Sequence, residues 1–198
     1  MEEREIEELK MKYNKMKYEK AAKKYTPNKI KYLFIAESPP YKLTKTGEMR
    51  YFYFEKIAGR DTLLKYTIES IFSEEYIKSK KEFWLKNLEN EGYFLIDAVE
   101  YPIDQFKKDT KRRNNHVRIN FNNLIEKIEK LKEDLIIDKD TKIILIKKNI
   151  FEILGEKLKE KGFNVLNEKL LPFPDWGINS ERYQKELKEL LLKDKNNK

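Results

Sequence analysis

The sequence contains no cysteine, and this absence excludes several kinds of functional site. Among its 198 residues there is also only one histidine. Disulfides, cysteine-ligated zinc, iron–sulfur clusters and a cysteine nucleophile are therefore excluded, and so is a conventional histidine-rich metal site. Any bound metal would need oxygen ligands, and we expect no cofactor.

Long apolar runs are also absent. No run approaches the roughly 18 residues needed to span a bilayer. The first ten residues, MEEREIEELK, lack the apolar core of a signal peptide. We therefore expect a cytoplasmic protein with no membrane partner. A length of 198 residues is typical of a single domain, which we expect to be monomeric.

Charge, in contrast, is abundant. Lys and Arg number 43 against 35 Asp and Glu, which gives a formal net charge of +8 and an isoelectric point of about 9.2. Such an excess favours a polyanion such as nucleic acid as partner. Abundant Lys and Glu with few glycines would also suit a thermophile or an AT-rich genome, so composition leaves both explanations open.

Short apolar runs alternate with helical patterns along the chain. Expected strands cover residues 31–36, 93–99, 142–147 and 163–167, and expected helices cover 3–24, 62–72, 75–89, 118–134, 149–161 and a last segment that begins at Ser180. Continuous apolar strands separated by helices predict a parallel sheet covered on both faces. The fold class is therefore α/β, a three-layer α/β/α sandwich with a central four-stranded parallel sheet.

The same pattern predicts a simple domain organisation. An N-terminal helix occupies residues 1–26 and packs on a domain that spans residues 27–192. Residues 193–198, which end in KDKNNK, are expected to be a disordered tail.

Two acids occupy the ends of expected strands. Ligands of open parallel sheets bind outside the carboxyl ends of the strands, so these positions are candidate sites. Glu37 follows the first apolar run and precedes two prolines that stiffen its loop. Asp97 ends the second run, where an unpaired charge would be costly. The structural alternatives are a cap or a surface lysine for Glu37 and a backbone or lysine partner for Asp97.

Basic and aromatic residues are expected around these acids. Residues 107–121 form a polar turn whose cations could contact phosphates, although a solvated loop is the alternative. Aromatic residues in 51–54 could stack on a base, and a proline-rich loop over 170–177 could press into nucleic acid or simply act as a packed lid. The candidates for nucleic-acid contact are Ser38, Pro39, Arg112, Arg113, His116, Lys147, Lys148, Pro172, Phe173 and Trp176.

A second interpretation uses only carboxylates. Glu37 and Asp97 could join Glu100 and Asp104 in a Mg²⁺ site, because this ion prefers carboxylate and water ligands. A carboxylate-metal nuclease or hydrolase is therefore an alternative function. The expected strand at 142–147 offers lysines, but it lacks the acid two residues earlier that many metal nucleases have.

Four segments in order resemble the uracil-DNA glycosylase superfamily. AESPP (36–40) is similar to the GEAPG motif of the family-4 enzymes, and YFYFEKIAGRDTLL (51–64) resembles their PFVGRAGxLL segment. FLIDAV (94–99) resembles the LLNxV segment, and LPFP (171–174) falls where HPSP is expected. The resemblance covers roughly residues 30 to 192 and implies a four-stranded α/β/α fold and a DNA partner, single-stranded or damaged.

The resemblance also implies roles for individual residues. Glu37 would position or activate water, Tyr53 or Phe54 would stack on the base, and Asp97 would take the place of the base-reading Asn. The chain departs from the pattern at Leu171, which stands where a catalytic His is expected and cannot donate to a departing base. We therefore predict a DNA-base glycosylase-like protein, with a catalytically silent nucleic-acid-binding relative as the alternative.

Overall fold

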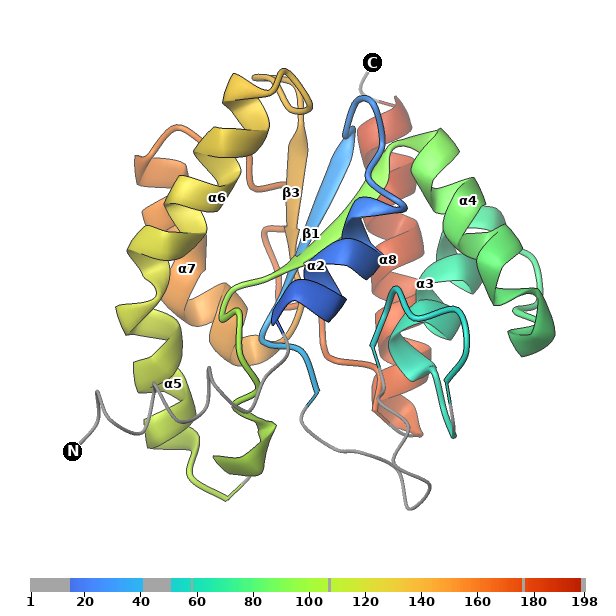
Figure 1. The fold of residues 1–198 in the computed structure, drawn as a ribbon, viewed down its shortest axis with the longest axis horizontal. Coiled ribbons are helices and arrows are strands. Elements are labelled where there is room, and N and C mark those ends of the chain that lie inside the picture. Colours follow the sequence, from blue (N-terminus) through green and yellow to red (C-terminus); the bar gives the residue numbers. More distant parts are fainter. Residues whose placement is uncertain (1–14, 41–50, 58, 107, 176, 197–198) are drawn as a thin grey trace.

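The computed structural model describes residues 15–40, 51–57, 59–106, 108–175 and 177–196. It is an α/β structure built around a parallel sheet (Figure 1). The strands are β1 (Tyr32–Ala36), β2 (Tyr93–Asp97) and β3 (Lys142–Leu145), in the order β2-β1-β3. Almost every strand residue is buried, as expected for a parallel sheet with both faces covered.

Strand register brings the carboxyl ends of the strands together. Ala36 of β1 is opposite Asp97 of β2, and Ile35 is opposite Leu145 of β3. The residues just beyond these positions therefore meet at one edge of the sheet. Glu37 and Lys147 are brought to the same place as Asp97, although they are far apart in the sequence.

The expected fourth strand is not formed, and the prediction of a four-stranded sheet is wrong. The segment after helix α7 (Lys148–Glu160) makes only isolated parallel bridges, from Val165 to Ile143 of β3 and from Leu171 to Ile146, the residue after β3. Between them the Asn167 side chain accepts a hydrogen bond from the Leu145 N–H at 2.9 Å and donates one to the Leu145 carbonyl at 3.1 Å. The Asn167 amide thus takes the backbone groups of Leu145 that a fourth strand would otherwise bond. Such competition with backbone hydrogen bonds is typical of Asn side chains.

Helices lie on both sides of this sheet (Figure 1). On one side are α5 (Thr110–Ile119), α6 (Phe121–Glu133) and α7 (Lys148–Glu160), and on the other are α3 (Thr62–Phe72), α4 (Lys81–Glu91) and α8 (Ile178–Asn196). Short 3₁₀ turns cover Lys78–Lys80 and Asp104–Phe106, and α2 (Lys15–Lys23) represents the described part of the expected N-terminal helix. None of the helices in the described ranges combines the length and apolarity needed to cross a membrane.

Two expected elements differ from the structure. The polar turn expected within 107–121 is mostly helix α5, which begins after Asp109 because that side chain accepts a hydrogen bond from the Arg112 N–H at 2.9 Å. Helix α8 starts at Ile178, before Ser180, and continues to Asn196 through most of the expected tail. Its buried Asp194 accepts a hydrogen bond from the Tyr32 hydroxyl at 2.8 Å, which ties the end of α8 to the sheet.

Candidate functional site

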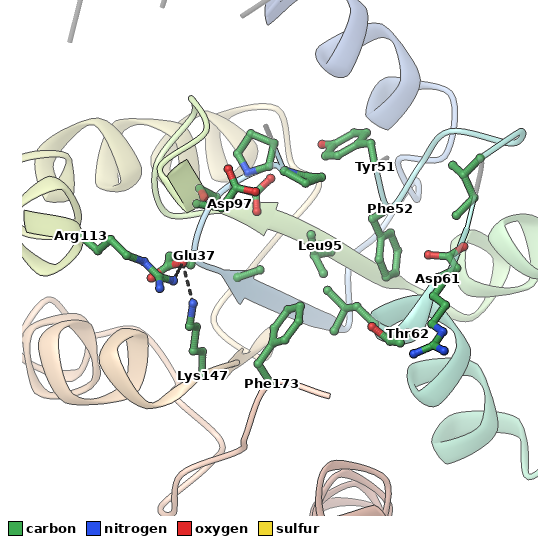
Figure 2. A pocket seen from close by; sticks show the side chains of 18 residues that line it. Glu37, Tyr51, Phe52, Asp61, Thr62, Leu95, Asp97, Arg113, Lys147 and Phe173 are labelled. Carbon is green, nitrogen blue, oxygen red and sulfur yellow. Dashed lines mark hydrogen bonds and ion pairs between the residues drawn. The ribbon is translucent and has the colours of Figure 1, made fainter. Parts of the chain in front are cut away.

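A cavity of about 510 Å³ lies at the carboxyl ends of the strands (Figure 2). Its lining comes from the loop after β1, the segment 51–63, the end of β2, and single residues of distant segments, among them Arg113, Lys147 and Phe173. A volume of this size can hold a ligand as large as a nucleoside. The parallel sheet thus places a cavity where the sequence predicted a site.

Glu37 lies at one side of this cavity and is almost enclosed by donors. Its carboxylate accepts hydrogen bonds from Lys147 Nζ at 2.7 Å, from Asn149 Nδ2 at 2.6 Å and from Arg113 Nη2. Its side chain is only 8% exposed. Burial acts to raise the pKa of Glu37, but Lys147 and Arg113 outweigh it and hold the pKa below its usual value. Glu37 is therefore a fixed negative charge that orients two cations.

Lys147 is held in an unusual backbone conformation. It has φ 89° and ψ 144°, close to a region that is essentially confined to glycine. Its N–H donates to the Leu171 carbonyl at 2.8 Å, and its own carbonyl accepts from the Phe151 N–H at 3.0 Å. The ammonium group points to Glu37 and lies 5.9 Å from the centre of the Phe173 ring (Figure 2). Strain of this kind is typical of functional sites.

Asp97 faces the same cavity with a different environment. Its side chain is buried, and no hydrogen-bond donor contacts its carboxylate within the described part of the chain. Burial raises the pKa of Asp97 to about 7; Lys127 acts in the opposite direction and Glu37 adds to the increase. An acid with a pKa near neutrality can accept or donate a proton at physiological pH, which is what general acid–base catalysis requires.

The aromatic wall of the cavity includes the residues just before the predicted Tyr53 and Phe54. Tyr51 and Phe52 line it, together with Phe173, which is 37% exposed. Tyr53 is buried in the core, where its hydroxyl donates to the Leu95 carbonyl at 3.0 Å and accepts from the Leu95 N–H at 2.6 Å. Phe54 packs on α2, with its ring centre 5.1 Å from that of Tyr18. Neither Tyr53 nor Phe54 is part of the cavity lining.

A buried ion pair supports this wall. Lys81 Nζ lies 2.8 Å from Asp61 Oδ2, and the two side chains are 1% and 9% exposed. The same ammonium donates to the Tyr51 carbonyl at 3.2 Å, and the Tyr76 hydroxyl donates to Asp61 at 3.0 Å. These contacts fix the backbone that carries Tyr51 and Phe52, because a buried charge keeps its partners in place.

The predicted basic residues separate into two groups. Arg113 and Lys147 reach the cavity, as described above. Arg112 instead lies over the Phe106 ring at 4.1 Å, and Lys148 is 71% exposed and 3.6 Å from Glu152. His116 is fully buried, stacked on Phe106 and hydrogen bonded to the Tyr101 hydroxyl at 3.1 Å. The prediction that His116 contacts nucleic acid is therefore wrong, because helix α5 turns it into the core.

The remaining predicted residues differ in their relation to the cavity. Ser38 and Pro39 line it, and Ser38 Oγ accepts a hydrogen bond from the Ile103 N–H at 3.4 Å. Pro172 is buried, and Leu171, at the place of the expected His, is only 2% exposed. Trp176 lies outside the described residues.

Three carboxylates of the alternative metal site, those of Glu37, Asp97 and Asp104, line the cavity without forming a metal-binding group. No group of three or more His, Cys, Asp or Glu that could hold a metal occurs in the described ranges. Glu100 lies 3.9 Å from Lys127, and Glu37 is engaged by its three donors. The geometry therefore gives no support to a carboxylate-metal nuclease.

Some site residues were missed from the sequence. Asn149 immediately follows the two predicted lysines, but its role depends on helix α7 starting at Lys148. Tyr51 and Phe52 belong to the aromatic run that was recognised, but that run is irregular, so alternation does not predict which rings face inward. Comparison of the chain with protein-family models, with curated proteins and with solved structures gives no match.

Proposed function

We propose that this protein binds a flipped nucleobase in the cavity and hydrolyses its N-glycosidic bond, as a divergent relative of the uracil-DNA glycosylase superfamily. The observation that carries the proposal is Asp97, a buried acid with no donor partner among the described residues, whose pKa is raised to about 7 in a cavity walled by aromatic rings. Flat apolar walls suit a base, and extrusion of the base from the stack is how enzymes reach the bond to the sugar.

Asp97 is the best candidate for activating water. In its ionised form it accepts the proton of a water molecule whose oxygen attacks C1′ of the sugar, and it stabilises the positive charge that develops there. Glu37 has the lower pKa of the two, but its lone pairs are committed to Arg113, Lys147 and Asn149. Two carboxyl groups with different pKa values can therefore divide the roles of base and anchor.

The departing base carries away the electron pair of the broken bond and needs a positive partner. In this chain Leu171 cannot provide one, because it is an apolar side chain and almost fully buried. The side chain of Lys147 lines the cavity, and the backbone N–H of the same residue donates a hydrogen bond to the Leu171 carbonyl. We assign to Lys147 and Arg113 the stabilisation of the negative charge on the base.

The test uses oligonucleotides that each contain one deoxyuridine, deoxyinosine or oxidised base, in single and double strands. Incubation with the folded protein should yield abasic sites, detected as alkali-labile breaks, from at least one of them. The variant D97N should lower the rate by at least about a hundredfold, since general base catalysis contributes about that much. The variant E100Q is the control, because Glu100 is another acid beyond β2 but does not line the cavity.

Two results would decide against hydrolysis. If folded protein yields no abasic product from any substrate, the activity is refuted. Binding that weakens with salt, but without product, would instead identify the catalytically silent nucleic-acid-binding relative, a reading that the burial of Leu171 favours.

A further inference from the structure

Lys147 has features that stabilisation of a departing base does not require. Its backbone adopts a conformation that is strained for a residue with a side chain. The hydrogen bonds of Lys147 N–H to Leu171 and of Phe151 N–H to the Lys147 carbonyl hold this conformation. The result is one amine directed into the cavity from the carboxyl end of β3 (Figure 2).

The surroundings of this amine make its neutral form more accessible than that of a free lysine. Burial lowers the pKa of Lys147, and the neighbouring Arg113 acts in the same direction, while Glu37 only partly compensates. A lysine that is desolvated beside another cation is the kind of amine that forms imines with carbonyl compounds. The side chain is still 28% exposed, so a ligand in the cavity can reach it.

We propose that the Lys147 amine forms an imine with the aldehyde of an abasic deoxyribose and thereby cleaves the DNA strand. This activity rests on the proposed function for the origin of its substrate, because removal of the base leaves an abasic sugar in the same cavity. The substrate is a deoxyribose in its open-chain aldehyde form that carries a phosphate on its 3′ oxygen.

The chemistry needs no oxidant or reductant. The amine nitrogen bonds to C1′ of the open-chain sugar, and the resulting C1′ hydroxyl takes a proton from protonated Asp97 and leaves as water, which gives the protonated imine and ionised Asp97. Asp97, ionised, then removes a proton from C2′, and the electron pair of that C–H bond shifts toward C1′. The pair then forms a C2′=C3′ double bond as the C1′=N bond re-forms, the C3′–O bond breaks and the 3′ phosphate leaves with the electron pair of that bond, and water finally hydrolyses the imine and restores the amine.

Lys148 provides a matched control on the adjacent residue. It is 71% exposed, lies 3.6 Å from Glu152 and does not line the cavity. Its amine has the same intrinsic chemistry as that of Lys147, but not the same access to a ligand in the cavity. A reaction that depends on placement should therefore distinguish the two lysines.

The experiment uses an oligonucleotide with a preformed abasic site and sodium cyanoborohydride, which reduces an imine to a stable covalent adduct. Because the abasic site is supplied, the result does not depend on base removal. We expect a covalent complex with the wild-type protein, with the modified peptide mapped by mass spectrometry to Lys147. K147R should reduce adduct formation by at least about tenfold, and K148R should leave it unchanged.

The outcomes separate the two proposals. An adduct at Lys147 without any base release supports the imine chemistry and refutes base hydrolysis; base release without any adduct does the reverse. No adduct, an adduct mapped to another amine, or one undiminished in a folded K147R protein would overturn the imine proposal. Peptide mapping of the wild-type adduct decides the question even if K147R does not fold.

Discussion

Replacing Asp97 by Asn should make the protein more stable relative to wild type as the pH rises. The native pKa of Asp97 is about 7, raised from 3.8 chiefly by burial. The native state therefore binds more protons than the unfolded state between these two values, and the free energy of unfolding falls as the pH increases through this window. The neutral amide of D97N does not titrate and removes this slope.

The magnitude follows from the size of the shift. Each pKa unit corresponds to about 1.4 kcal/mol, so a shift of about three units gives a penalty of about 4 kcal/mol above pH 8. About 3 kcal/mol of this difference should develop between pH 5 and pH 8. The difference between the two proteins isolates Asp97, because most other titrating groups are common to both. Any fixed cost of the new amide shifts this difference equally at every pH.

Urea denaturation of wild type and D97N at half-unit steps from pH 5 to pH 8 would measure the effect, since urea does not screen charges as guanidinium does. The free energy of unfolding of D97N should rise steadily relative to that of wild type over this range. The proposed catalytic activity of D97N should be lower than that of wild type. A difference in unfolding free energy that does not change with pH, or one that changes in favour of wild type, would refute the assignment of a raised pKa to Asp97.

Three further predictions concern the residues around the cavity. K147G should be more stable than K147A by about 1–2 kcal/mol in thermal or urea unfolding, because both lack the amine and only glycine is unstrained at φ 89°; equal stabilities would contradict the strain. E37Q should lose about 2 kcal/mol of unfolding free energy at pH 7, because two cations lose their charged acceptor, whereas the stability of E100Q should stay near that of wild type. Similar losses in the two variants would show that the contacts of Glu37 contribute little to stability. Y53F should lose about 1–3 kcal/mol of unfolding free energy, because the buried Leu95 N–H and carbonyl lose their partner. It should keep its activity per folded molecule, and a large fall in that activity would place Tyr53 in the site.

Apolar runs and their neighbours predicted much of this fold. Strands β1, β2 and β3 lie within the expected segments, and helices α3 and α7 match their expected ranges within a residue. These elements could be found because burial of strands on both faces leaves an uninterrupted apolar run. The fourth strand failed because the Asn167 side chain competes for the backbone groups of Leu145, a choice that depends on the neighbouring strand.

The position of the cavity was also predictable, but the environment of its lining residues was not. Glu37 and Asp97 follow apolar runs, and parallel strands bring such positions to one edge. The sequence did not indicate which aromatic residue of 51–54 would face the cavity, or that His116 would be buried. Both depend on the path of a segment and the rotation of a helix after packing.

The sequence by itself determined the inventory of this protein: acids and lysines at strand ends, aromatic rings nearby, one histidine and no cysteine. Only the tertiary structure decided what these groups can do. Arg113 and Lys147 reach Glu37 from 76 and 110 residues away, and they keep it ionised. Asp97 receives no such donor among the described residues, so burial raises its pKa to about 7. The physical reason is that charge interactions and desolvation depend on distances in space, which the order of residues does not specify.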